Sequence, residues 1–164
     1  MMIFDTHCHY NDESFDSDRD DLIKGLPREG VDRICEIGYN LESSEKAVHL
    51  AEEYRGTGLS VYSAVGFHPQ NANEFNPDSF QKLEELSYSE SVVAIGEIGL
   101  DYYRLDKRSP IEKEQDEEKK KRGEEVFEDF DPEPAMQKEC FISMIELAKK
   151  RNLPIVIHSR DAAL

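Results

Sequence analysis

The sequence lacks a hydrophobic run long enough to cross a lipid bilayer, and its first residues lack the basic start and apolar stretch of a secretory signal peptide. We therefore expect a cytoplasmic protein. Cysteine is scarce as well, because only Cys8, Cys35 and Cys140 occur, widely separated and without a CxxC pair. This spacing argues against a disulfide framework and against a thiolate zinc site, and it predicts reduced, mostly buried thiols.

Basic residues are few relative to acidic ones. The chain of 164 residues carries 20 Lys and Arg against 36 Asp and Glu, so its formal net charge is −16. This charge opposes loose electrostatic binding to nucleic acid or to an anionic membrane. It still allows a nucleic-acid substrate, because an enzyme that grips phosphate through bound metal cations acquires its positive charge locally.

Short apolar, β-branched runs recur along the chain and predict strands. They cover residues 2–4, 31–37, 59–65, 92–98 and 153–157. The runs VVAIGEIGL and LPIVIH are nearly continuously apolar, which is typical of strands buried on both faces of a parallel sheet. One domain is expected for a chain of this length.

Helices are predicted between the strands. Apolar residues recur at helical spacing in residues 47–54, 80–86 and 141–148. Asn76 and Pro77 are suited to the N-cap and the first position of the second of these helices. A further helix over residues 18–29 is interrupted by a glycine and a proline.

The alternation of strand and helix predicts a parallel α/β fold with right-handed crossovers. It is compatible with an open doubly wound sheet and with a TIM (β/α)8 barrel. A dinucleotide-binding sheet would need a glycine-rich turn after its first strand, where this chain has Asp-Thr-His-Cys-His, so the barrel is favoured. Such a barrel takes about 250 residues, so we expect a partial barrel of about five of eight strands, whose exposed last strand favours self-association.

Residues 106–133 differ in composition from the rest of this single domain. They contain 12 acidic and 7 basic residues and almost nothing to bury. Such a segment is typical of a solvated, mobile or loosely helical insertion in a loop. It follows directly on the sequence GEIGLDYYR.

His7 and His9 stand one residue apart at the end of the first strand, in a chain with 5 histidines. Residues i and i+2 of a strand face the same side, so both imidazoles can point at one metal ion while Cys8 turns away. Parallel α/β folds place their sites at this end of the strands, which favours ligation over an ordinary polar strand end.

Three more side chains end later strands. Glu97 is a lone carboxylate among apolar residues and glycines, and a buried carboxylate needs a cation or hydrogen-bond donors. His158 ends the fifth strand after an apolar run, which makes it a further candidate ligand. His68 ends the third strand, and we assign it to substrate contact, whereas His49 lies on a helix away from this edge.

Four stretches of the chain resemble, in order, the signatures of the TatD-type metal-dependent hydrolases, which are deoxyribonucleases within the wider amidohydrolase-like barrel group. The stretches are FDTHCH, GFHP, AIGEIGLDYY and LPIVIHSRDA. They span nearly the whole chain apart from the charged insertion.

The resemblance implies a TIM barrel whose C-terminal face holds two divalent metal ions, either Mg, Mn or Zn. It places His7 and His9 on one ion, the catalytic Glu97 between both ions, and His158 on the second. The implied reaction is hydrolysis of phosphodiester bonds in DNA by a water that the two metals activate. Asp101, Tyr102 and Arg104 would line the same mouth as substrate contacts, with loop salt bridges and packing as their alternative roles.

The family pattern continues with another histidine and an aspartate from later strands. Asp161 follows His158 too closely to replace that aspartate, and it should cap the next helix. Two other functions stay open: a metal-binding barrel fragment that acts through self-association or a partner without hydrolysis, and an amidohydrolase-like esterase or lactonase. The latter group commonly uses a carboxylated lysine, in whose place this chain offers Glu97.

Overall fold

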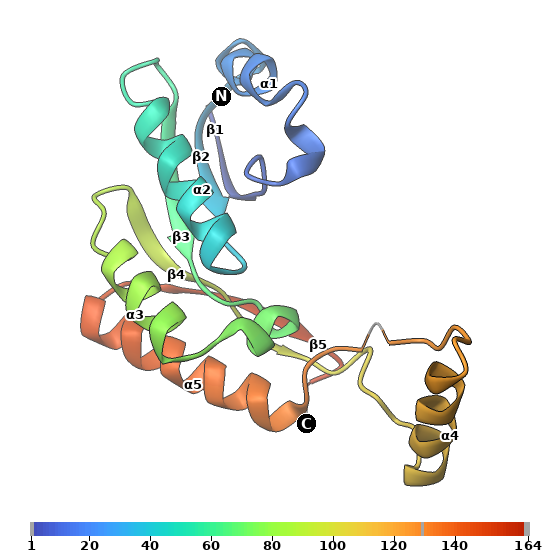
Figure 1. The fold of residues 1–164 in the computed structure, drawn as a ribbon. Coiled ribbons are helices and arrows are strands. Elements are labelled where there is room, and N and C mark those ends of the chain that lie inside the picture. Colours follow the sequence, from blue (N-terminus) through green and yellow to red (C-terminus); the bar gives the residue numbers. More distant parts are fainter. Residues whose placement is uncertain (1, 129, 163–164) are drawn as a thin grey trace.

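The fold was analysed in a computed structural model that describes residues 2–128 and 130–162 (Figure 1). A single sheet of five parallel strands has the order β1-β2-β3-β4-β5. The strands are β1 Ile3–Cys8, β2 Val31–Ile37, β3 Ser60–Val65, β4 Val92–Asp101 and β5 Ile155–Arg160. The helices are α1 Arg19–Gly25, α2 Leu41–Glu53, α3 Pro77–Leu86, α4 Pro110–Lys121 and α5 Pro134–Arg151. Short 3₁₀ turns cover Glu13–Phe15, Leu26–Glu29 and Pro69–Glu74.

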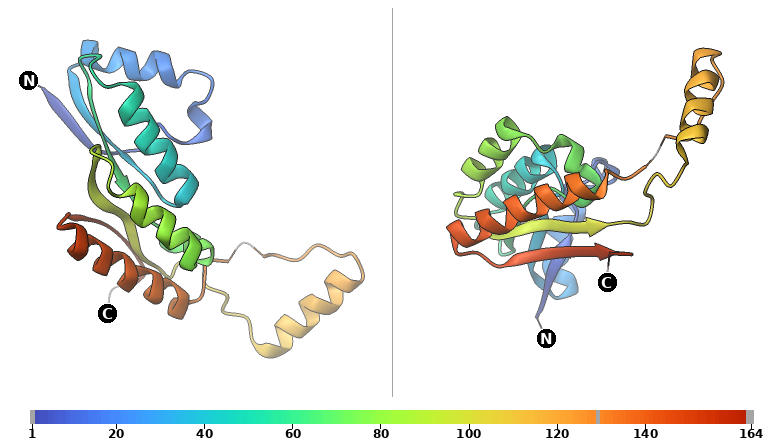
Figure 2. Two further views of the ribbon diagram at one scale, coloured as in Figure 1. Left: turned by 60° about the vertical axis from the view of Figure 1, so that its left-hand side comes forward. Right: turned by 90° about the horizontal axis from the view of Figure 1, so that it is seen from below.

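The strand order decides between the two closures that the sequence allowed. Neighbours in the sheet are also neighbours along the chain, and α2, α3 and α5 lie on one side of the sheet (Figure 2). A doubly wound sheet would reverse its strand order and carry helices on both faces. The five strands therefore form half of a barrel, which confirms the predicted partial (β/α) barrel.

The predicted elements are present, but several are longer than their apolar runs. β1 continues past Phe4 through the polar Asp5 and Thr6, because its backbone pairs with β2. α3 begins as expected, since the Asn76 side chain accepts the backbone N–H groups of residues 78 and 79, and Pro77 occupies the first turn. The interrupted first helix is divided into α1 and the 3₁₀ turn that follows it.

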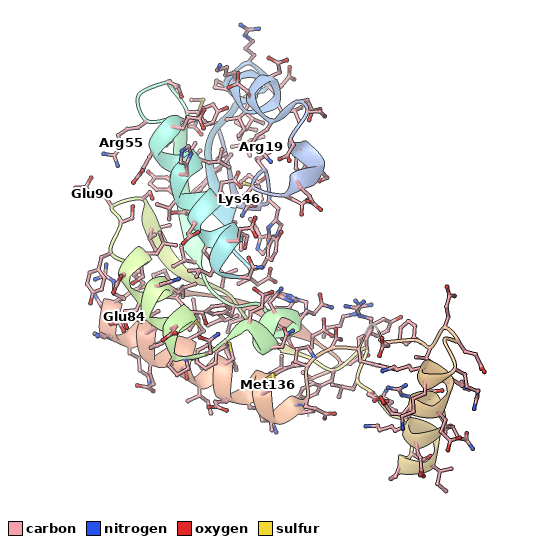
Figure 3. All side chains as sticks on the ribbon, in the orientation of Figure 1. Arg19, Lys46, Arg55, Glu84, Glu90 and Met136 are labelled. Carbon is pink, nitrogen blue, oxygen red and sulfur yellow. The ribbon has the colours of Figure 1, made fainter. Side chains whose placement is uncertain are left out.

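Two apolar clusters fix the helices to the outer face of the sheet. One joins α3 and α5 to β3 and β4, with Phe67, Leu83 and Met144 essentially inaccessible to solvent. The other joins α1 and α2 to the first three strands and includes Ile23 and Ile34. This double anchorage gives the carboxyl ends of the strands a rigid support. At the opposite edge, Arg55 before β3 pairs with Glu90 before β4 at 3.4 Å (Figure 3).

The charged insertion projects away from the half-barrel (Figures 1 and 2). It contains the regular helix α4, which Ser109 caps by accepting the backbone N–H of Glu112 and in which no residue is buried. Its base returns to the fold where the Arg104 guanidinium meets the Asp131 carboxylate at 3.1 Å. Within the described residues, every helix is too short or too polar to span a membrane.

Candidate metal centre

His7 and His9 converge at the end of β1. Their Nε2 atoms lie 3.2 Å apart, although the two residues are separated by Cys8. The Cys8 side chain faces the other way and is buried in the cluster of α1 and α2. Burial first, and then the charge of Glu36, raises the pKa of the Cys8 thiol, so the thiol stays protonated. The alternation of a strand thus produces a pair of imidazoles with a common target.

A backbone carbonyl orients His9. Its Nδ1 atom lies 3.1 Å from the carbonyl oxygen of Ile37, so Nδ1 carries the proton and Nε2 keeps its lone pair for the site. Burial, followed by the charge of His7, lowers the pKa of His9. A neutral ring with its second nitrogen held by a carbonyl is the usual arrangement of a metal-binding histidine.

Glu97 lies between this pair and His158. One carboxylate oxygen, Oε2, is 3.4 Å from Nε2 of His7, and the other, Oε1, is 3.2 Å from Nδ1 of His158. Two glycines allow the close approach of β4 to β5: a Cβ atom at Gly96 would collide with Val156, and one at Gly99 with the carbonyl oxygen of His158. The pairing of the two strands is irregular in this stretch.

Asp101 holds the far side of the His158 ring. Its Oδ2 atom is 3.0 Å from Nε2 of His158, and the Asp101 carboxylate is almost completely buried. The Gln70 amide donates to the same oxygen at 3.3 Å. Both ring nitrogens of His158 face a carboxylate, but the contact of Nε2 with Asp101 is the shorter and the more buried one, which favours the tautomer with its proton on Nε2 and with Nδ1 facing Glu97. The Asp101 carboxylate thus contacts a candidate ligand and is almost inaccessible to solvent.

His68 packs against His158, with ring centroids 4.2 Å apart. Its Nδ1 atom accepts the backbone N–H of Gln70 at 3.2 Å, so the proton of the neutral ring resides on Nε2. Burial, followed by the charge of His158, lowers the pKa of His68 to about 4. His68 therefore offers a neutral N–H donor.

Two groups of possible metal ligands share Glu97. The first contains His7, His9 and Glu97, the second His68, Glu97 and His158, and in each group the donor atoms lie within 4.8 Å of one another. Imidazole nitrogen and carboxylate oxygen suit zinc, manganese and other divalent ions. The clustering of imidazoles around one carboxylate fits bound cations, because these would be shared by the nitrogen and oxygen atoms that face one another.

The remaining candidates have other surroundings. The Arg104 guanidinium contacts Asp131, and the Tyr102 hydroxyl is buried without a hydrogen-bond partner among the described residues. His49 is exposed on α2, as expected. Asp161 follows β5 and has a positive φ of 52°. The sequence pattern did not indicate the residues that support the site, which are the partly buried Gln70 and the buried Asp131 and Gln137.

Comparison with known proteins shows the family of the chain. The sequence profile described as "TatD related DNase" matches residues 4–164. The chain belongs to the TatD family. It is 36% identical over 162 residues to a Bacillus subtilis protein named as the uncharacterized metal-dependent hydrolase YabD, covering 98% of this chain and 52% of that protein. It is 32% identical over 160 residues to the 3'-5' ssDNA/RNA exonuclease TatD of Cronobacter sakazakii, covering 98% and 50% of the two chains.

Solved structures of TatD proteins share the fold. The Escherichia coli TatD homologue YJJV superposes with a TM-score of 0.69 at 26% identity, covering 97% of this chain and 51% of that one. A TatD family hydrolase from Entamoeba histolytica has a TM-score of 0.78 at 22% identity, covering 99% and 51%. The chain thus spans about half the length of the relatives it matches. Its membership supports the use of divalent metal by a hydrolase.

Proposed function

We propose that this chain carries a metal centre that hydrolyses phosphodiester bonds in DNA. The observation that carries the proposal is the position of Glu97, whose two carboxylate oxygens face His7 on one side and His158 on the other at 3.4 and 3.2 Å. A carboxylate with imidazoles on both sides is the arrangement expected of a ligand shared by two cations.

The proposed ligand set follows from the orientation of each ring. His7 and His9 would hold one ion and His158 the other, with Glu97 between them. Two such ions would polarise a water molecule, bind the non-bridging phosphate oxygens and stabilise the leaving oxygen. His68, a neutral N–H donor, would hydrogen-bond to a phosphate oxygen instead of serving as a ligand.

The three residues predicted as substrate contacts at the end of β4 differ in their surroundings. Asp101 is better suited to orient His158 than to meet the substrate, because its carboxylate is buried against that ring. The Tyr102 hydroxyl is buried and has no hydrogen-bond partner in the described part of the chain, and Tyr102 remains in the proposal as a substrate contact. Arg104 would have to share its charge between a phosphate and Asp131.

The charge of the chain agrees with metal-mediated binding. A net charge of −16 repels a polyphosphate chain, so the bound cations would supply the attraction. The relatives named as ssDNA/RNA exonucleases favour nucleic acid as the substrate class. Binding should therefore depend on divalent metal and not on a basic surface.

A nuclease assay with parallel metal titration tests the proposal. The chain is incubated with end-labelled single-stranded DNA or RNA and with Mg²⁺ or Mn²⁺, next to samples with chelator and samples of Glu97→Ala. We expect shortening of DNA that requires metal and Glu97. Binding of metal without cleavage of either nucleic acid would indicate a metal-binding unit that does not hydrolyse by itself, and cleavage of a carboxylic ester in the same samples would indicate esterase chemistry.

A further inference from the structure

Gln137 is a polar side chain with no access to solvent, close to the start of α5. Its Oε1 atom accepts the backbone N–H of Asp101 at 2.8 Å. Its Nε2 atom donates to the carbonyl oxygens of Asp101 and of Pro132, each at 2.7 Å. The side-chain amide thus makes three hydrogen bonds to backbone groups, two at the end of β4 and one just before α5. Figure 3 labels the preceding residue, Met136, where α5 meets the base of the insertion.

The end of β4 needs such a partner. β3 ends at Val65, which pairs with Ile95, so β4 extends beyond its neighbour. On the other side, Tyr102 donates its backbone N–H to Arg160 at 2.9 Å. Successive residues of a strand direct their N–H and C=O groups to opposite sides, so the groups of Asp101 face the side that β3 no longer covers. Buried backbone groups require hydrogen-bond partners. Beyond the end of β3, the side chain of Gln137 supplies these partners to the backbone of Asp101.

The hydrogen bonds continue from Asp101 to the candidate ligand. The main chain of Asp101 is held by Gln137, and its carboxylate contacts Nε2 of His158 at 3.0 Å. The second carboxylate oxygen accepts the backbone N–H of Tyr103 at 3.0 Å. The position of the Asp101 main chain therefore sets where its carboxylate meets Nε2 of His158, while the Glu97 carboxylate faces Nδ1.

We infer that Gln137 is a positioning residue for His158. It fixes the main chain of Asp101, and the Asp101 carboxylate then holds His158 in the Nε2–H tautomer with Nδ1 directed at Glu97. The inference rests on the proposed function, in which His158 is a metal ligand. Because Gln137 also binds Pro132, it ties the base of the charged insertion to the same hydrogen-bond chain.

The tautomer of His158 provides a test that needs neither metal nor substrate. Imidazole ¹⁵N shifts are recorded on metal-free protein at pH 8 for the wild type, Gln137→Met and Lys138→Met, with the His158 signals assigned by a His158→Gln variant. Methionine keeps the length of glutamine but makes none of the three hydrogen bonds. Lys138 is the exposed neighbour and serves as the matched control.

We expect the Nε2–H tautomer of His158 in the wild type and in Lys138→Met, and a mixture of both tautomers in Gln137→Met. Manganese titration should show the ion on the His158 side bound about tenfold more weakly in Gln137→Met, the range typical of lost outer contacts to a ligand. Affinity on the His7 and His9 side should stay the same. A folded Gln137→Met that retains the pure tautomer would overturn the inference, whether or not the protein cleaves DNA.

Should Gln137→Met not fold, Gln137→Glu decides the question. Its carboxylate can still accept the N–H of Asp101 but cannot donate to the two carbonyl oxygens. We expect a smaller but measurable fraction of the Nδ1–H tautomer in this variant. An unchanged His158 in folded Gln137→Glu would contradict the inference.

Discussion

Nδ1 of His158 lies 3.2 Å from Oε1 of Glu97, although the whole charged insertion and the whole of α5 separate the two residues along the chain. The contact exists because β4 and β5 are parallel neighbours whose carboxyl ends meet at one edge. His7 reaches the other oxygen of Glu97 from β1, at the far side of the half-barrel. Curvature of the sheet therefore gathers ligands from strands that are not adjacent.

Replacement of Glu97 by alanine should reduce the number of bound Mn²⁺ ions from two to one. Both proposed sites share this carboxylate, so its removal leaves each with imidazoles only, and we expect the remaining ion to bind more than about tenfold more weakly. Calorimetric titration measures the stoichiometry, with Glu139→Ala on the exposed face of α5 as the control. Retention of two ions in Glu97→Ala would count against the shared ligand.

Combined replacement of His7 and His9 by alanine should strongly lower the affinity for the first metal ion and leave the affinity on the His158 side unchanged. The adjacent Cys8→Ser variant is the matched control, because its side chain faces the helices and a hydroxyl can keep the contact with the carbonyl oxygen of Cys35. We expect unchanged metal affinity in Cys8→Ser. Equal losses in both variants would mean that the segment as a whole, and not the imidazoles, determines binding.

The sequence could predict the strand ends because two simple rules operate there. Alternation along a strand places His7 and His9 together, and parallel pairing brings the ends of β4 and β5 to the same edge. The edge of the sheet and the outward direction of Cys8 follow from local pattern alone.

The sequence could not assign the supporting residues, because their partners are fixed only by packing. In the sequence, Gln137 is one polar residue on an amphipathic helix. It binds the backbone of Asp101 because β4 extends beyond β3, which the local sequence does not indicate. Asp101 reads as a polar residue after a strand, yet its carboxylate is buried under His158. Such contacts join elements far apart in the chain, so no local periodicity indicates them.

Glu36 should make the stability of the fold depend on pH. It is inaccessible to solvent on β2, and its Oε2 atom accepts the backbone N–H of Asn11 at 3.0 Å. Burial outweighs these hydrogen bonds and raises the pKa of Glu36 from 4.5 to about 7. The folded state therefore keeps a proton that the unfolded state loses above pH 4.5.

The sign follows from this difference in bound protons. The stabilisation from protonated Glu36 is complete below pH 4.5, declines as the pH rises to 7, and is absent above it. Its size is about 3 kcal/mol, from the free energy equivalent of each pKa unit. Urea unfolding at pH 5 and pH 8 should show a smaller difference in Glu36→Gln than in the wild type, with exposed Glu52→Gln as the control. The same difference in all three proteins would rule out this carboxyl as the source.

Removal of α4 and the residues next to it in the charged insertion should leave the free energy of unfolding almost unchanged. No residue of α4 is buried, and its charges mostly pair with one another at the surface. Exposed ion pairs contribute little, so replacing residues 107–127 by a short Gly-Ser linker should change the free energy of unfolding by less than about 1 kcal/mol. Urea denaturation measures this free energy, and a loss of several kcal/mol would show that residues 107–127 pack on the half-barrel.

Asp131, at the base of the same insertion, should behave in the opposite way. Its side chain is fully buried, and its two oxygens accept the backbone N–H and the guanidinium of Arg104 at 3.0 and 3.1 Å. In Asp131→Asn the carboxylate becomes neutral and one oxygen becomes a donor facing donors, so we expect a loss of about 2 kcal/mol. Exposed Glu128→Gln on the same segment is the control, and urea unfolding compares the two. A cost at Asp131 no larger than at Glu128 would mean that the Asp131 side chain does not hold the base of the insertion, which would then be attached as loosely as α4.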